Sequence, residues 1–460
     1  MAAGVPSTEE LESLLQAEDR ELDQRAIRIV SAKRDDLVEY SLLNRTPADV
    51  KRRLAERAVP DIGSDRAMGS MCGMAVGDAL GHVFEFMPAV DVPGEDRFDL
   101  ETMQFYGGSN AFRLERGQWT DDAAMGRCMA DSLIMRRSLD GSDMRTRFWC
   151  WWNRGYNNAF RKDRSRSSSV GLGGNIAKSL VVLTQAASRG EPVPPTYDAR
   201  TEDAGNGSLM RFAPVAIFFQ NAEPEVLYDA ARLSSYTTHP GVIAAEACSL
   251  LAHLIVAALR RPSGPVDAKA FLEAETAAYL ERSGLSSKSG WGYDQMKWLV
   301  TGHPPLATER CWRWREPCLD IQGTLRARGG SYNGYPVSAG YFGSYALDGL
   351  AMALWSVYHT RSFDEAVTKS INLLGDADSH GSIAGQIAGA LYGYSSINPQ
   401  FITWLNKWDD NDFATSALLL QHIGRGHATS PIPALPTAKG PRVTAGAMPP
   451  PTLGRVVTQP

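Results

Sequence analysis

Glycine recurs at every fourth position in one stretch of the C-terminal half, at Gly381, Gly385, Gly389 and Gly393. The stretch, GSIAGQIAGALYG, is uncharged, and its isoleucines and leucine recur at helical spacing, so it is predicted to be a helix. Small residues four apart lie on one face of a helix and let a second helix approach closely. The pattern therefore predicts a helix near the centre of a helical domain.

The remaining sequence favours the same fold class. Apolar residues at helical spacing recur between residues 68 and 424, and alternating runs typical of strands are scarce. We therefore predict a compact, all-α, multi-helix domain over residues 66–427. Residues 1–65 are rich in charge and predict short helices appended to that domain. Residues 428–460 contain eight prolines and no acidic residue, which predicts a disordered tail.

Composition narrows the classes of partner. The formal net charge is −5, from 47 Lys plus Arg and 52 Asp plus Glu, so neither a nucleic acid nor a membrane surface is expected as a partner. Residues 242–259 are apolar over about the length of a bilayer span, but they include Glu246 and His253 and are interpreted as a buried core helix. The first residues lack a signal-peptide pattern and the six cysteines include no CxxC pair, so we expect a cytoplasmic location.

Two acidic clusters stand directly before predicted helices: QWTDD at 118–122 and GDADS at 375–379. Acids and hydroxyls at a helix start are favoured as N-caps and by the helix dipole, so two capped helices are one interpretation. Adjacent carboxylates repel each other unless a cation lies between them, which favours an oxygen-ligated metal site instead. Carboxylate and hydroxyl ligands suit Mg²⁺ or Mn²⁺ better than zinc or copper. The spacing leaves both interpretations open. The candidate ligands are Thr120, Asp121, Asp122, Asp376, Asp378 and Ser379.

Three further segments are candidates for chemistry. Glu85 lies between Phe84 and Phe86, and apolar surroundings would raise its pKa and suit it to acid–base work; the alternative is a partly exposed loop glutamate. Glycine-rich turns at 171–175 and 205–211 precede predicted helices, where backbone N–H groups can bind an anion, although most such turns are only turns.

Five segments, taken in order, resemble the ADP-ribosylglycohydrolase family. They are GMAVGDALGHVFEF (73–86), GQWTDDAAMGRCMADSL (117–133), GNGSLMRFAPVAIF (205–218), TTHPGVIAAEA (237–247) and the long segment 343–393, which includes GDADSHGSIAGQ. The resemblance covers residues 68–424. The family includes hydrolases of ADP-ribosylarginine and ADP-ribosylserine and the nitrogenase-reductase-activating glycohydrolases.

The resemblance implies an enzyme with a central cleft and two divalent ions, Mg²⁺ or Mn²⁺, held by the six candidate ligands. It implies hydrolysis of the bond between ADP-ribose and a protein side chain, most often arginine, so the partners would be an ADP-ribosylated protein and the product ADP-ribose. Glu85, Asp121 and Asp378 would be the catalytic residues. The substrate-binding residues would be Gly171, Gly173, Gly174, Asn206, Gly207, Ser208, Met210 and His239.

The chain departs from the family pattern at three positions: Ser379 replaces a threonine, Leu374 a glycine and Ala123 a hydroxyl residue. None of these removes a candidate ligand, so an intact site is expected. The basic run at 161–166 and the tryptophan-rich segment 291–345 fit the family poorly, and either shape the substrate entrance or form a solvated loop and an extra packing layer. Two other functions remain open: hydrolysis of a free ADP-ribose derivative, and a non-catalytic ADP-ribose-binding or structural protein.

Overall fold

The computed structural model describes residues 4–16, 42–44, 46–160, 162–163, 165–166, 168–198, 204–333, 335–336, 340–427 and 432. The tail predicted at 428–460 lies outside the described residues except for Ile432, and so does much of the predicted N-terminal appendage.

The helices are α1 (Thr8–Gln16), α3 (Ala48–Ala58), α4 (Ile62–Gly81), α5 (Asp121–Arg136), α6 (Gly141–Arg154), α7 (Gly174–Ser188), α8 (Ala213–Phe218), α9 (Pro224–Tyr236) and α10 (Val242–Arg260). They continue as α11 (Ala268–Arg282), α12 (Trp291–Thr301), α13 (Ile321–Arg328), α14 (Ala346–Tyr358), α15 (Phe363–Ile371), α16 (Ala377–Tyr392), α17 (Pro399–Asp409) and α18 (Asp412–His427). The strands are β1 (Arg97–Asp99), β2 (Gln104–Tyr106), β3 (Ser331–Tyr332) and β4 (Tyr335–Pro336).

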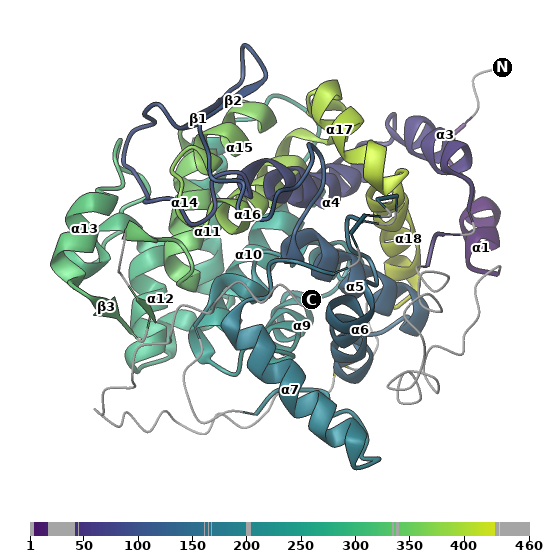
Figure 1. Cartoon of the computed structure of the whole chain (residues 1–460), viewed down its shortest axis with the longest axis horizontal. Coiled ribbons are helices and arrows are strands. Elements are labelled where there is room, and N and C mark those ends of the chain that lie inside the picture. The colour runs from purple at the N-terminus through teal and green to yellow at the C-terminus, as the bar shows by residue number, and fades with distance from the viewer. Residues whose placement is uncertain are drawn as a thin grey trace.

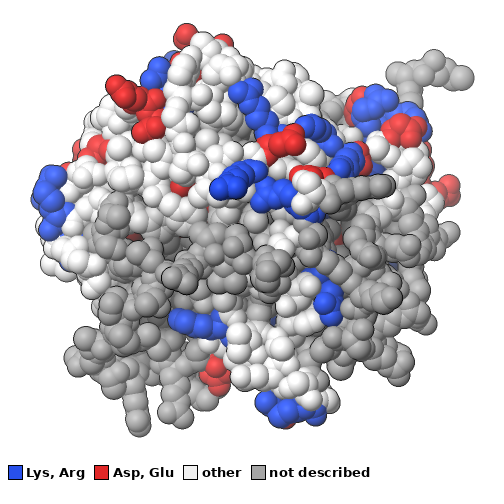
Figure 2. Space-filling view, in the orientation of Figure 1, with Lys and Arg blue, Asp and Glu red and all other residues white. Residues whose placement is uncertain are grey.

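The all-α prediction is confirmed. The strands of the described residues form only two short antiparallel ribbons, in which Phe98 pairs with Phe105 and Tyr332 with Tyr335. Figure 1 shows α4 and α16 near the middle of the molecule, α12 and α13 at one end, and α1 and α3 at the other. Figure 2 shows basic and acidic side chains interspersed over the described surface of this face.

The predicted glycine helix is α16, and the helix that packs against its glycine face is α4. A Cβ atom on Gly385 would clash with the carbonyl oxygen of Gly73, and one on Gly389 would clash with that of Gly69. Gly77 meets the backbone of Gly381 in the same way. Because neither helix has side chains along this line, their backbones touch, which brings the last turn of α4 beside the first turn of α16.

The apolar helix α10 is a core helix, as predicted. By length and composition it could cross a membrane, but 89% of its apolar stretch is buried inside the fold. Glu246 within it is paired with Arg232 at 3.0 Å and with Lys288 at 2.8 Å, so its buried charge is compensated. In the tryptophan-rich segment, Trp312 is fully buried and donates to Asp348 at 2.7 Å. That part of the segment is an extra packing layer.

The start of the chain packs against the helical domain. Ser7 and Glu10 form a reciprocal capping box, with N–H to side-chain distances of 2.8 and 3.2 Å. Glu10 also accepts two bonds from Arg57, at 2.7 and 2.9 Å. The expected boundary between residues 65 and 66 falls inside α4, because Asp61 caps this helix by accepting from the N–H of Ser64 at 2.9 Å.

Candidate metal centre

The two acidic clusters meet although they are far apart in the sequence. Thr120 precedes α5, Asp376 precedes α16, and the first turns of the two helices face each other. The Thr120 hydroxyl donates to Asp378 at 3.3 Å across 258 residues of chain. The sequence alone does not bring the clusters together; the packing of α16 on α4 and of α5 beside them does.

Neither cluster serves as an ordinary helix cap. The side chains of Thr120 and Asp376 occupy the N-cap positions of α5 and α16 without bonding to the helix N–H groups. The cap of α5 comes from another helix: Asp78 of α4 accepts from the N–H and the hydroxyl of Thr120, both at 2.9 Å, and from the N–H of Ala123 at 2.9 Å. The interpretation as two self-capped helices is therefore wrong.

Six carboxylates are gathered here, and each is at most 7% exposed. They are Asp78, Glu85, Asp121, Asp122, Asp376 and Asp378. Oxygen atoms of Asp78, Asp122 and Asp378 lie within 4.8 Å of one another, and so do those of Glu85, Asp376 and Asp378. The interpretation of Glu85 as a partly exposed loop residue is also wrong, since its side chain is buried.

Burial raises the pKa values of these carboxyl groups, because the charged form loses its hydration. The pKa of Asp376 and of Asp78 is raised to about 7 and that of Asp378 to about 6, in each case mainly by burial. The pKa of Glu85 is raised well above its usual value by burial and by the neighbouring charge of Asp378, to which Glu85 is hydrogen-bonded. Without a cation, burial therefore favours the protonated form of several of these groups.

The donor atoms fit a hard divalent cation. Glu85 Oε2 and Asp122 Oδ1 are buried and lack a hydrogen-bond partner, which is costly unless something else satisfies them. The ligand atoms that the cluster offers are carboxylate oxygens and the Thr120 hydroxyl, which suit Mg²⁺ or Mn²⁺. Two of the predicted ligands lie at the rim of the cluster: Asp121 contacts Gly171, and the Ser379 hydroxyl lies 3.8 Å from the Met210 sulfur.

Part of the predicted substrate-binding set adjoins the acidic cluster. Asn206 donates to Asp376 at 2.7 Å and to the carbonyl of Gly343 at 3.0 Å. A Cβ on Gly207 would lie 2.9 Å from the His239 ring, so this ring packs on a glycine backbone. Burial lowers the pKa of His239 to about 3, and its Nδ1 bonds to the Thr238 hydroxyl at 2.8 Å. A neutral ring therefore packs against Gly207, the residue after Asn206.

The other predicted substrate-binding residues are glycines of the loop that leads into α7 and two residues of the packed interior. Gly171 has φ +91° and lies against Asp121, while Gly174, at the start of α7, has open space where a side chain would be. Ser208 is 1% exposed and accepts a bond from Ser235 at 3.0 Å, so its hydroxyl is held within the packed interior. Met210 is equally buried, and its carbonyl accepts from Ser382 of α16 at 2.7 Å.

Two residues beside the cluster were not selected from the sequence. Asp78 belongs to the segment GMAVGDALGHVFEF and lies in the last turn of α4, seven residues before Glu85; an acid among small residues was a usable signal. Tyr341 is partly exposed and donates its hydroxyl to Asp376; burial of that hydroxyl and the nearby charges of Asp376 and Glu85 raise its pKa well above the usual value. No pattern in its glycine-rich surroundings pointed to it.

The departure at Leu374 has a structural consequence. Leu374 has φ +61° and Gly375 has φ +74°, in the left-handed region where glycine is unstrained. A leucine there costs about 1–2 kcal/mol. The turn is held nevertheless, because His380 bonds to the Leu374 carbonyl at 2.8 Å and the Asp376 N–H donates to Phe342 at 2.8 Å.

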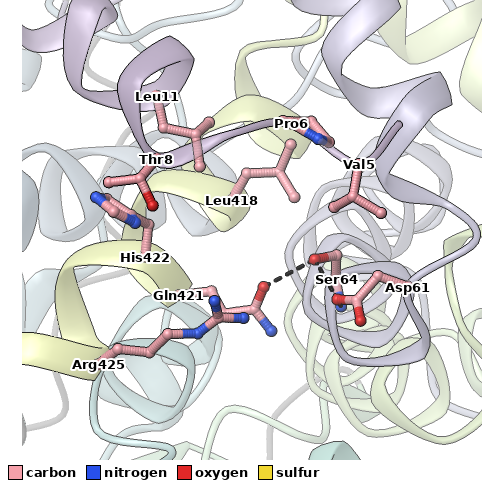
Figure 3. Close-up of a pocket in the computed structure, with 10 residues that line it drawn as sticks. All are labelled: Val5, Pro6, Thr8, Leu11, Asp61, Ser64, Leu418, Gln421, His422 and Arg425. Atoms are coloured by element: carbon pink, nitrogen blue, oxygen red, sulfur yellow. Dashed lines mark hydrogen bonds between the residues drawn. The ribbon is translucent and has the colours of Figure 1, made fainter. Parts of the chain in front are cut away.

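A pocket of about 170 Å³ lies elsewhere, where residues 5–11 cross the start of α4 and the second half of α18 (Figure 3). Its lining residues are Val5, Pro6, Thr8, Leu11, Asp61, Ser64, Leu418, Gln421, His422 and Arg425. Ser64 donates to Gln421 at 2.9 Å, and His422 is paired with Glu12 at 3.0 Å. No member of the acidic cluster lines it, so the cluster remains the candidate site.

The fold and the cluster define the class: an all-α protein with buried carboxylates suited to divalent metal ions. A sequence profile described as ADP-ribosylglycohydrolase matches residues 60–427. The chain therefore belongs to the ADP-ribosylglycohydrolase family and is a glycohydrolase, as the five motifs predict.

Named relatives agree with this assignment. The chain is 29% identical to ADP-ribosylarginine hydrolase Tri1 of Pseudomonas putida over 77% of this chain and 79% of the relative. It is 25% identical to ADP-ribosyl-[dinitrogen reductase] glycohydrolase of Rhodospirillum rubrum, over 75% and 90%, and 25% identical to ADP-ribosylhydrolase ARH3 of Gallus gallus, over 73% and 88%. A solved ADP-ribosylglycohydrolase-related protein complex matches with a TM-score of 0.52 and 28% identity, over 79% of this chain and 99% of that one.

Proposed function

We propose that this protein removes ADP-ribose from modified arginine side chains of proteins by hydrolysing the glycosidic bond at the ribose, with the help of two divalent metal ions. The observation that carries the proposal is the cluster of six buried carboxylates at the facing ends of α4, α5 and α16. The choice of arginine rests on the relatives from Pseudomonas putida and Serratia proteamaculans, both named ADP-ribosylarginine hydrolase Tri1, at 29% and 27% identity.

The metal ions would be held by oxygen atoms from both helix ends. The proposed ligands are Thr120, Asp121, Asp122, Asp376, Asp378 and Ser379. Bound Mg²⁺ or Mn²⁺ would position the ribose hydroxyls and lower the pKa of water. Asn206 donates a hydrogen bond to the Asp376 carboxylate, and the Asp78 carboxylate accepts one from the Thr120 hydroxyl. These two bonds fix the proposed ligands in place.

Glu85 is the proposed acid–base residue. Its burial favours the protonated form near neutral pH, so it can deliver a proton to the departing side chain and recover one from water. The surrounding carboxylates would stabilise the positive charge that develops on the ribose as the bond breaks. Asp121 and Asp378, which lie at the two helix starts, would act on the same reacting centre.

The test is release of ADP-ribose from arginine-linked and serine-linked modified proteins in the presence of Mg²⁺. The proposal expects release from the arginine-linked protein, and loss of release in the Asp378→Asn variant with its helix content unchanged. Wild-type turnover in that variant would show that Asp378 is no ligand. Release only from the serine-linked protein would overturn the choice of arginine.

A further inference from the structure

We propose that three aromatic side chains, Phe86, Phe112 and Tyr341, form an aromatic wall beside the acidic cluster that binds the guanidinium group of the modified arginine. The proposal deepens the proposed function, on which it rests, by naming the residues that recognise the leaving group.

The Phe86 ring contacts the other two rings, and half of its side chain is open to solvent. Phe86 is 50% exposed, although it is a large apolar side chain in a well-packed protein. Tyr341 stacks on it with ring centroids 5.8 Å apart and an angle of 25°, and Phe112 meets it edge-on at 5.7 Å and 70°. Because its neighbours fix the Phe86 ring, its free area is available as a preformed surface.

The backbone presents Phe86 in an unusual conformation. Its φ is +67°, a value that bulky residues rarely adopt and that costs free energy unless neighbouring bonds hold it. Neighbouring bonds hold it there: the Phe86 N–H donates to Gly375 at 3.1 Å, and Ser109 donates to the Glu85 carbonyl at 2.9 Å. The surrounding structure thus supports a conformation that leaves a large ring exposed.

The aromatic wall is attached to the cluster at two points. Phe86 directly follows Glu85, whose carboxylate lies within the cluster. Tyr341, the ring stacked on Phe86, donates its hydroxyl to Asp376. A side chain that leaves a ribose held at these carboxylates would therefore depart next to the wall.

The basic run supports the wall. Arg166 donates to the backbone carbonyls of Phe112 and Arg113, both at 2.8 Å, and lies over the Phe160 ring at 4.4 Å. Its guanidinium is thus engaged in holding the Phe112 loop. Lys162 of the same run is paired with Asp410 of the loop after α17. These contacts give the run a structural role next to the proposed substrate entrance.

The chemistry of the surroundings favours a cation. Two divalent ions would bring four positive charges. With Glu85 protonated, as the proposed function requires, the other five carboxylates leave one negative charge. Aromatic faces attract guanidinium groups, which are planar and weakly hydrated. A serine-linked leaving group is a neutral hydroxyl, so neither the negative charge of the cluster nor the aromatic faces would attract it. The wall therefore favours arginine over serine.

The test compares Phe86→Ala with Phe86→Tyr, which keeps the aromatic face, and with Trp291→Ala, which removes an exposed aromatic residue outside the wall. In Phe86→Ala we expect KM for the arginine-linked substrate to rise about tenfold, equivalent to about 1.4 kcal/mol, with kcat nearly unchanged. Phe86→Tyr and Trp291→Ala should resemble the wild type. The Kd of ADP-ribose should stay within about twofold in all three variants, because the product lacks the guanidinium.

A second probe, methylguanidine, tests the wall without relying on turnover. Ligand-observed NMR should detect its binding to the wild type and to Phe86→Tyr, and lose it in Phe86→Ala. A weaker affinity for ADP-ribose in Phe86→Ala would assign the ring to the nucleotide and overturn the proposal, as would an unchanged KM. If the wild type cleaves neither linkage, the proposed function fails. Methylguanidine binding then tests the aromatic wall independently of that function.

Discussion

At the scale of single residues, Asp78 connects the fold to the site. Its carboxylate accepts from Thr120 and Ala123 and thereby fixes the first turn of α5, on which Thr120, Asp121 and Asp122 stand. It supports the candidate ligands and is buried beside them. We therefore expect loss of the Asp78 carboxylate to weaken metal binding more than it destabilises the fold.

The Asp78→Asn variant tests this role. Asparagine keeps the shape but has one acceptor oxygen where aspartate has two, so a bond to Thr120 or to Ala123 is lost. We expect Mn²⁺ affinity and kcat/KM to fall about 10- to 100-fold, the range for residues that orient metal ligands. Asp131→Asn in α5 is the matched control, since Asp131 is also a buried acceptor, bonded by Tyr156 at 2.6 Å and by Asn157 at 2.8 Å. Equal losses of Mn²⁺ affinity in both variants would mean that Asp78 acts only through stability.

The raised pKa values predict how the metal-free protein responds to pH. The pKa of Asp376 is about 7 and that of Asp378 about 6, compared with about 4 in the unfolded chain. Between about pH 4 and 7 the folded protein holds protons that the unfolded chain has released, so its free energy of unfolding falls as pH rises. Melting temperature in EDTA should fall over this window.

Mg²⁺ should remove most of this pH dependence above pH 6, because it replaces the protons. The Asp378→Asn variant, with one acid fewer, should lose less stability per pH unit in EDTA than the wild type. Identical pH profiles for the two proteins, measured by thermal unfolding, would show that the cluster does not control this response.

At the scale of elements, the contact between α4 and α16 sets the position of the site. It places the end of α4 beside the start of α16; Glu85 follows α4 by four residues, and Asp376 directly precedes α16. The glycine repeat predicted that α16 is central. It did not identify the partner: Gly69, Gly73, Gly77 and Gly81 of α4 recur at the same spacing, but spacing alone does not determine which two helix faces meet.

The Gly385→Ala variant measures this contact. Its Cβ would clash with the Gly73 carbonyl, a backbone atom that cannot move aside without separating the helices. We expect the free energy of unfolding to fall by about 1–3 kcal/mol or more, measured in urea. Gly426→Ala in α18 is the control, since no atom lies within 4 Å of its Cβ position; it should be neutral or stabilising by up to about 1 kcal/mol. A neutral Gly385→Ala would refute backbone contact.

The short ribbons and turns were less predictable than the helices. Strands β1 and β2 have three residues each, too few to leave an alternating pattern in the sequence. Left-handed residues such as Phe86 and Leu374 are likewise set by tertiary bonds and not by residue type. Sequence periodicity therefore predicted the helical framework but not the turns that complete the site.

At the scale of the whole molecule, the order of five motifs carried more information than any one of them. Each acidic pair taken alone allowed a capped helix, and their meeting across 258 residues required the fold. The sequence singled out Glu85 and the two acidic pairs. It did not single out Asp78 or Tyr341, which lie beside the cluster. Ser208, predicted to bind substrate, has its hydroxyl bonded to Ser235 in the packed interior. Burial and side-chain direction are properties of the packed molecule.

The most direct test of the account is to remove all divalent metal with EDTA, return Mn²⁺ in steps, and follow bound Mn²⁺ and ADP-ribose release from an arginine-linked protein together. We predict no release from the stripped protein and recovery as binding reaches about two ions per chain. The Asp378→Asn variant should neither bind the full complement nor recover. Release that persists after the metal is removed would contradict the claim that these carboxylates act by holding metal ions.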